Sequence, residues 1–163
     1  MIGRRRFVRL AVLAAAAAAT PAAFGVELPA ATRAALESAS LLYVATRRKS
    51  GRRSEAAPIW FMYEGDAVFF TTSPDSWKAK RIRRGSPLYI WVGSADGPFV
   101  VGEAKPVTDP AVVAHMGEVY AKKYWIAWLG LFRPRPDRVA AGKTLAYRVE
   151  LSEGVPPPAP AAS

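Results

Sequence analysis

Apolar residues gather in short runs along most of the chain, and turn-forming residues separate one run from the next. Runs rich in Val, Ile, Tyr, Phe and Trp between Gly, Pro, Asp and Ser clusters are typical of β-strands joined by hairpins. Two of the linking segments, 49–52 and 64–66, contain a glycine and are short enough for tight turns. The pattern predicts six strands, over residues 41–46, 58–63, 67–72, 88–92, 99–107 and 144–151.

Helical spacing and helix-start residues predict three helices, over 29–39, 73–84 and 108–129. In the second, Ser73 is placed to cap the helix, with Pro74 and Asp75 in the first turn. In the third, Asp109 is placed as the N-cap. Strands that follow one another without alternating helices indicate an antiparallel sheet with segregated helices, a mainly β (α+β) barrel or sandwich. The sequence has no internal repeat and no glycine-rich dinucleotide loop.

The composition narrows the chemistry that the chain can carry. With 163 residues, the chain is long enough for one ordinary domain. It has no Cys, which excludes disulfides, a thiol nucleophile, an iron–sulfur cluster and a Cys-based zinc site. A single His argues against a His-ligated metal or a Ser-His-Asp triad, so no catalytic residue and no metal site are assigned. A bound cofactor is therefore expected to carry any chemistry.

The net charge of +10 is unevenly distributed along the chain. Its first residues, Arg4-Arg5-Arg6-Phe7-Val8-Arg9, resemble a twin-arginine export signal and precede an apolar run over 10–19. We expect residues 1–25 to be this signal, recognised by the twin-arginine translocase, and the protein to be periplasmic or otherwise extracytoplasmic. The alternative is that the segment is retained as an anchor, although ten residues are too few for a spanning helix.

The remaining chain divides into a domain over 26–152 and a Pro/Ala-rich tail over 153–163, which is expected to be disordered. Three basic groups lie in the domain: 47–53, 78–84, and a looser group of Lys122, Lys123, Arg133, Arg135 and Arg138. The ordinary interpretation of each group is a solvated face. A nucleic-acid-binding barrel is the alternative. The expected export argues against it, and so do aromatic residues that fall on core-like strands.

One junction has the residues needed to hold a phosphate. The strand over 67–72 runs into a predicted helix start through Thr71, Thr72 and Ser76, and Lys78 follows within the first turn. Hydroxyls, free backbone N–H groups and an ammonium together suit a phosphate monoester. Plain helix capping beside a solvated basic helix is the alternative.

The segment 43–109 resembles the FMN-binding split β-barrel proteins of the pyridoxamine 5′-phosphate oxidase-like superfamily. The order and spacing of several short pieces carry this resemblance. They are Tyr43-Val44-Ala45-Thr46, Gly51-Arg52, Pro58-Ile59-Trp60-Phe61, Phe69-Phe70-Thr71-Thr72-Ser73-Pro74, the segment 78–84, Pro87, Gly102-Glu103-Ala104 and Thr108-Asp109.

The resemblance implies a six-stranded antiparallel split barrel that forms a homodimer and binds FMN, or a deazaflavin analogue, in clefts between the subunits. It also implies the cofactor-binding residues. Pro58, Ile59 and Trp60 would lie along the isoalloxazine ring; Thr71, Thr72, Ser76 and Lys78 would hold the phosphate, assisted by Lys80 or Arg81.

The function implied is that of an exported flavin- or deazaflavin-dependent oxidoreductase acting on a small molecule that the sequence does not name. The chain departs from the longer oxidases because its last strand lacks their Arg- and Trp-containing substrate motif, so vitamin-processing activity is not expected. The alternative is a non-catalytic protein that sequesters a flavin or haem. Haem would call for a His near the pocket, and His115 is the one available.

Overall fold

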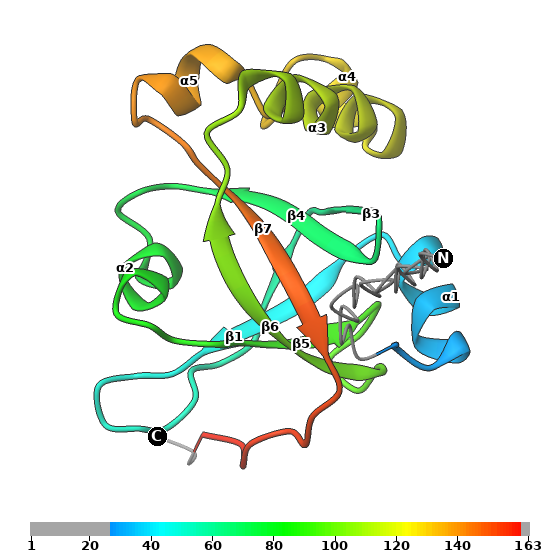
Figure 1. The fold of residues 1–163 in the computed structure, drawn as a ribbon, viewed down its shortest axis with the longest axis vertical. Helices are drawn as coiled ribbons and strands as arrows, with labels where there is room; N and C mark the ends of the chain where they lie inside the picture. The colour runs from blue at the N-terminus through cyan, green and yellow to red at the C-terminus, as the bar shows by residue number, and fades with distance from the viewer. Residues whose placement is uncertain (1–26, 161–163) are drawn as a thin grey trace, which may run out of the picture.

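A computed structural model describes residues 27–160 of the chain. An antiparallel sheet of seven strands curls into a half-barrel, in the order β2-β1-β5-β6-β7-β4-β3 (Figure 1). The strands are β1 (Leu42–Thr46), β2 (Ala57–Ile59), β3 (Met62–Glu64), β4 (Ala67–Thr72), β5 (Leu88–Val92), β6 (Phe99–Pro106) and β7 (Leu145–Ser152). The helices are α1 (Ala30–Ser38), α2 (Trp77–Arg83), α3 (Pro110–Lys123), α4 (Trp125–Trp128) and α5 (Pro136–Ala140). The predicted α+β class and antiparallel curled sheet are confirmed.

The expected count of six strands is wrong because the predicted strand over 58–63 is two strands. Its first part, β2, pairs with β1, and its second part, β3, pairs with β4 at the opposite edge of the sheet. Between them, the backbone of Trp60 and Phe61 bonds to side chains of α3 and the residue after it. The chain therefore passes from one edge of the sheet to the other at these two residues, which brings the edges of the half-barrel together.

Alternate residues of β4 serve two separate cores, because successive side chains of a strand point to opposite faces of a sheet. Val68 and Phe70 are fully buried in the main core inside the curled sheet. Phe69 faces the other way and packs against the second core, where α3 contributes Met116 and Tyr120. The sheet thus separates the main core from the layer in which α3 lies.

Helices α3, α4 and α5 lie together at one end of the sheet, apart from α1 and α2 (Figure 1). The predicted helix over 108–129 is interrupted at Tyr124, whose backbone is extended, with φ −125° and ψ 115°. The N-cap prediction for Asp109 is confirmed, since its carboxylate accepts from the N–H of Ala111 at 2.8 Å. The capping prediction for Ser73 is wrong: α2 begins at Trp77, and Ser76 is its N-cap.

Gly117 brings the segment after α4 back onto α3. A Cβ atom at this buried glycine would lie 2.6 Å from the carbonyl oxygen of Pro134 and 3.2 Å from Nε of Arg133. Only a residue without a side chain permits this approach. The contact places the basic segment that follows α4 beside the end of β4.

The predicted signal over 1–25 lies outside the described residues. Residues 153–160 have no regular secondary structure, and the carbonyl of Pro157 accepts from Nε of Arg53 at 3.2 Å. Within 27–160, no helix has the length and apolar character that crossing a membrane requires.

Candidate functional site

A cavity of about 680 Å³ lies where β2 and β4 meet the segment between α4 and β7. We call it the basic cavity. Five of the residues expected at the cofactor site line it: Pro58, Ile59, Trp60, Thr71 and Thr72. Because β2 and β4 lie far apart in the sheet order, it is the crossing at Trp60 that brings these two groups to one place.

The charge of the lining is of one sign. Arg133, Arg135, Arg138 and Lys143 line the basic cavity, and no Asp or Glu does so among the residues that the structure describes. Arg135 forms a two-pronged ion pair with Asp137, with N–O distances of 3.1 and 2.9 Å. The other three cations form no ion pair within residues 27–160. The cavity therefore suits an anionic ligand.

One wall of the basic cavity is aromatic. The ring of Trp60 stacks on Tyr124 at a centroid distance of 4.4 Å and an interplanar angle of 5°. The hydroxyl of Tyr120 donates to the carbonyl of Trp60 at 2.9 Å, and Phe132 meets the Trp60 ring edge-on at 6.1 Å. Trp60 is thus held by its backbone and on one face of its ring, as a wall for a flat ligand requires.

The two tyrosine hydroxyls remain protonated at neutral pH. Burial raises the pKa of Tyr124 to about 12, and burial raises the pKa of Tyr120 well above its ordinary value. The Tyr120 hydroxyl donates to the carbonyl of Trp60, and the Tyr124 hydroxyl accepts from the N–H of Phe61 and donates to the carbonyl of Ser40. Neither hydroxyl can serve as a general base near pH 7.

Thr72 connects the cavity to the start of α2. Its Oγ1 lies 3.0 Å from Oγ of Ser76, and Ser76 accepts from the N–H of Ala79 at 3.1 Å. Ser76 therefore caps the helix and at the same time contacts a residue of the cavity lining. Capping is therefore observed for this segment, whereas Ser76 itself does not line the cavity and its phosphate-binding role remains a prediction.

Lys78 and Lys80 do not line the basic cavity in the single chain. The ammonium of Lys78 lies 5.8 Å from the centre of the Phe70 ring, and burial lowers the pKa of Lys78 to about 8. No ion pair to Lys78 occurs in the described part of the chain. Lys80 is exposed and lies over the Trp77 ring at 5.2 Å.

Comparison with known sequences places this chain in a family. The sequence model of the pyridoxamine 5′-phosphate oxidase family matches residues 28–153. This chain belongs to that family. A comparison with curated proteins gives no match.

Three solved structures illustrate the shared split-barrel fold of the family. An F420 reductase is 21% identical, with a TM-score of 0.54, over 77% of this chain and 97% of its own. The heme storage protein HutZ of Vibrio cholerae is 11% identical, with a TM-score of 0.52, over 76% and 89%. A FAD-binding protein of Mesorhizobium loti is 13% identical, with a TM-score of 0.51, over 75% and 86%. At these identities the likeness shows the fold.

The four cations that line the basic cavity were not among the site residues predicted from the sequence. Three of them, Arg133, Arg135 and Arg138, belong to the loose basic group that the sequence displays, which was the available signal. No short-range pattern in the sequence indicates that this basic group faces the residues of β2 and β4. The packing of the segment around Arg133 and Pro134 against Gly117 brings it there.

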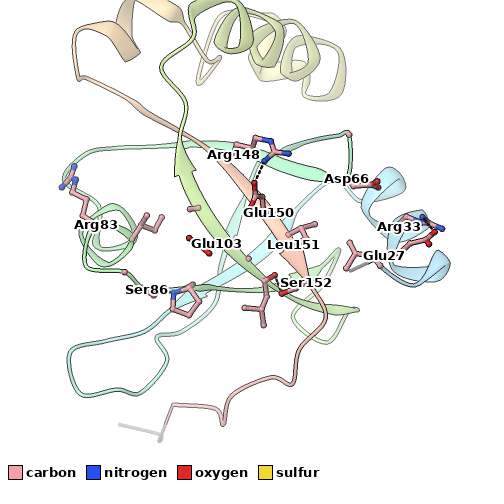
Figure 2. A pocket seen from close by; sticks show the side chains of 18 residues that line it. Glu27, Arg33, Asp66, Arg83, Ser86, Glu103, Arg148, Glu150, Leu151 and Ser152 are labelled. Carbon is pink, nitrogen blue, oxygen red and sulfur yellow. Dashed lines mark hydrogen bonds and ion pairs between the residues drawn. The ribbon is translucent and has the colours of Figure 1, made fainter. Parts of the chain in front are cut away.

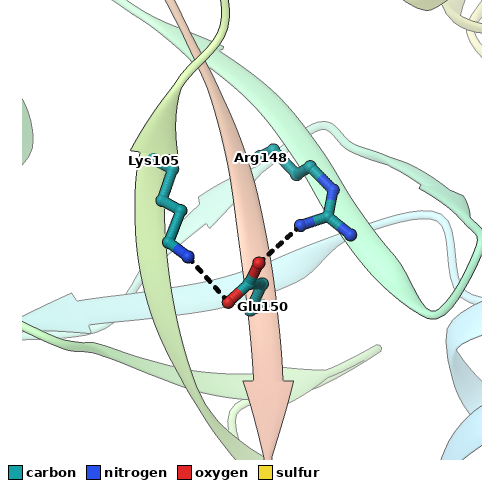
Figure 3. A network of polar contacts seen from close by, with 3 residues as sticks. All are labelled: Lys105, Arg148 and Glu150. Atoms are coloured by element: carbon teal, nitrogen blue, oxygen red, sulfur yellow. Dashed lines mark hydrogen bonds and ion pairs between the residues drawn. The ribbon is translucent and has the colours of Figure 1, made fainter. Parts of the chain in front are cut away.

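A larger cavity of about 1230 Å³ lies over β6 and β7, between α1 and α2 (Figure 2). Its lining carries both signs of charge, and two of its three cations, Arg33 and Arg148, are paired with acids. Arg33 contacts Glu27 at 2.8 Å, and Glu150 binds Arg148 at 2.8 Å and Lys105 at 3.0 Å (Figure 3). Paired cations attract an anion less than unpaired ones do, so charge favours the smaller basic cavity as the cofactor site.

His115 lies away from the basic cavity. Its Nε2 is 2.9 Å from Glu64, and it lines a different, apolar depression beside Phe69 and Val107. Among residues 27–160, no cluster of three His, Asp or Glu side chains has the arrangement of a metal site.

Proposed function

We propose that this protein is an oxidoreductase that binds a phosphorylated flavin-type cofactor in the basic cavity. FMN is the cofactor that we propose first, and a deazaflavin is the alternative. The observation that carries the proposal is that one cavity is lined by the ring of Trp60, which is held in place by stacking, and by four cations. No Asp or Glu lines this cavity among the described residues. Membership of the pyridoxamine 5′-phosphate oxidase family supports it, as does the likeness to an F420 reductase and a FAD-binding protein.

The residues present fit such a group. Cofactor and ligand sites usually measure about 300–1,000 Å³, and the basic cavity lies within this range. Pro58, Ile59 and Trp60 form an apolar side for a flat ring system. Thr71 and Thr72 offer hydroxyls, and the cations offer charge, to a phosphate.

When bound, the cofactor would supply hydride or electron transfer. The protein would orient the ring against Trp60, neutralise the phosphate and keep water from the apolar side. Burial raises the pKa of Tyr120, whose side chain lines the cavity, well above its ordinary value, and no Asp, Glu or His lines the cavity among residues 27–160. The substrate of the proposed reaction is a small molecule whose identity is open.

A homodimer, in which a second copy closes the cavity, is part of the same proposal and is supported by the family resemblance. Ser76, Lys78 and Lys80 are proposed to assist in holding the phosphate from α2. Export by the twin-arginine route also remains a proposal, because residues 1–25 lie outside the described residues. Fractionation of cells producing the native chain and an Arg4→Lys/Arg5→Lys variant tests the export.

A second candidate is a non-catalytic protein that sequesters a flavin or haem. A described lining without Asp, Glu or His is also what a carrier would show, and the fold is shared with a heme storage protein. The position of His115 outside the basic cavity gives haem no His ligand there.

The test is the absorption spectrum of the purified protein, followed by titration with FMN, a deazaflavin and haem. A flavin or deazaflavin band, and saturable binding of that compound, is the expected result. An Arg138→Gln/Lys143→Gln variant should bind more weakly, whereas the control Lys49→Gln/Arg52→Gln, on the exposed hairpin, should bind as the native chain does. A colourless protein that binds none of the three would overturn the proposal. Turnover with a reductant then separates the enzyme from the carrier.

A further inference from the structure

Five large apolar side chains form an exposed surface on α4 and the loop after it, and we call this surface the aromatic patch. Their exposed fractions are 73% for Trp125, 72% for Trp128, 57% for Leu129, 55% for Leu131 and 77% for Phe132. Trp and Phe dominate buried cores in soluble domains, so a contiguous run of such exposure marks a surface that meets an apolar partner.

The fold holds these side chains outward. Within α4, Ala127 is fully buried against α3, which turns Trp125 and Trp128, three residues apart, to the outer face. The chain then turns at Gly130, where φ is +86°, and the N–H of Leu131 donates to the carbonyl of Ile126 at 3.2 Å. Phe132 adopts a φ of 55°, which is uncommon for a residue with a side chain.

The surroundings of the aromatic patch are positively charged. Between Glu118 and Asp137 the sequence contains no acidic residue. Lys122 is exposed one turn before Trp125, and Arg133 is exposed directly after Phe132. Neither forms an ion pair in the part of the chain that the structure describes.

This charge argues against a contact in which the patches of two copies meet each other; the second copy proposed above closes the basic cavity, which Leu131 and Phe132 also line. In a symmetric dimer the same patch meets itself, so Lys122 and Arg133 of one copy would approach those of the other. Like charges placed across an interface are unfavourable. An occupant with an apolar interior and an anionic surface satisfies both the aromatic residues and the cations.

We propose that the aromatic patch docks on the surface of an anionic phospholipid bilayer. Trp is enriched at the boundary between headgroups and acyl chains, and Trp, Phe and Leu beside Lys and Arg are typical of surfaces that lie in this boundary. Lys122 would contact lipid phosphates and add to the attraction of an anionic leaflet, whereas Arg133 also lines the basic cavity. In this proposal the protein rests on the membrane through the patch.

The experiment measures co-sedimentation of the full chain with vesicles of phosphatidylcholine alone and of phosphatidylcholine mixed with phosphatidylglycerol. The native chain should bind the mixed vesicles, with a blue shift of Trp fluorescence, and binding should weaken in high salt. The Trp125→Ser/Trp128→Ser variant should bind at least about tenfold more weakly. Both chains share residues 1–26, so any affinity of that segment is common to them.

Trp77→Ser is the matched control, because Trp77 is 65% exposed but lies on α2, outside the patch. It should bind vesicles as the native chain does, and circular dichroism should show both variants folded. Three results would overturn the proposal: equal binding by the double variant, equal binding to neutral vesicles, or no binding by the native chain. A change from dimer to monomer in light scattering of the double variant would also overturn it, since the patch would then be covered by a second copy.

Discussion

The hydroxyl of Tyr124 accepts a hydrogen bond from the backbone N–H of Phe61 at 3.0 Å and donates one to the carbonyl of Ser40 at 2.8 Å. Phe61 lies at the crossing between β2 and β3, where no neighbouring strand is available to satisfy its N–H. Tyr124 interrupts the helical region at its own position and also stacks on Trp60. One side chain thus joins the edge crossing of the sheet to the wall of the basic cavity.

Tyr124→Phe should destabilise the fold. The variant keeps the aromatic ring, and so the stacking on Trp60, but it leaves the buried N–H of Phe61 without its partner. The expected loss is about 1–3 kcal/mol in the free energy of unfolding, measured by chemical denaturation. Tyr43→Phe is the control, because Tyr43 is a partly buried tyrosine on β1 whose hydroxyl forms no side-chain hydrogen bond within residues 27–160. Equal denaturation midpoints for the two variants would contradict the role given to the hydroxyl.

Lys78→Met should weaken binding of a phosphorylated cofactor without destabilising the free protein. Met keeps the length of the side chain and removes a half-buried charge that has no ion-pair partner among the described residues. The expected loss of affinity is about 1–3 kcal/mol through the lost charge-assisted bond. Titration of the cofactor measures the affinity, and thermal unfolding of the free protein measures stability. Lys49→Met, on the exposed hairpin, is the control. Unchanged affinity in Lys78→Met would place the phosphate elsewhere.

The affinity for the phosphate should fall as the pH rises through about 8. Burial lowers the pKa of Lys78 to about 8, so the ammonium loses its proton over a range in which an ordinary lysine keeps it. The second ionisation of a phosphate monoester is complete by then, since its pKa is about 6, so the ligand charge stays constant. Titrations in Lys78→Arg should show little such fall because the guanidinium remains charged. A parallel fall in both proteins would mean that another group titrates.

Gly102→Ala should destabilise the sheet. A Cβ atom at Gly102 on β6 would lie 2.2 Å from Cγ1 of Val149 on β7 and 3.3 Å from Cδ1 of Ile90, both buried side chains. The expected cost of overpacking is about 1–3 kcal/mol by chemical denaturation. Val149→Ala removes the atom that the new methyl group meets, so the double variant should lose less stability than the sum of the two single variants. Additive losses would show that the contact with Val149 is not the cause.

Elements defined by local pattern were predicted with their bounds. The strand over 67–72 is β4, the strand over 88–92 is β5, and Asp109 caps α3. The two strands depend on β-propensity and on flanking turn residues, and the cap depends on a hydrogen bond between residues two positions apart. All of these are local in sequence. The predictions over 58–63 and 108–129 were wrong in the middle of each element. Their interruptions, at Trp60–Phe61 and at Tyr124, bind to each other across more than sixty residues of sequence.

The residues of the candidate site likewise divide into those that local sequence predicted and those that it did not. Thr71, Thr72 and Ser76 were recognisable because a strand, hydroxyls and a helix start follow one another in sequence. Arg133, Arg138 and Lys143 were not, because they meet β2 and β4 only through tertiary packing, which for Arg133 includes the close approach at Gly117. The binding roles of all the predicted residues remain predictions, and Ser76, Lys78 and Lys80 do not line the cavity in the single chain.

The sequence by itself determined the α+β class, most strand positions, a chemistry without cysteine, and a resemblance to the pyridoxamine 5′-phosphate oxidase family. Each of these depends on residue type or on spacing over a few positions. Only the tertiary structure decided that β2 and β3 lie at opposite edges of the sheet. It also decided that four cations line the same cavity as Thr71 and Trp60, and that Trp125 and Trp128 face outward. Contacts between residues distant in sequence fix these features, because burial and hydrogen bonding at Tyr124 and Gly117 override the local preference of the chain.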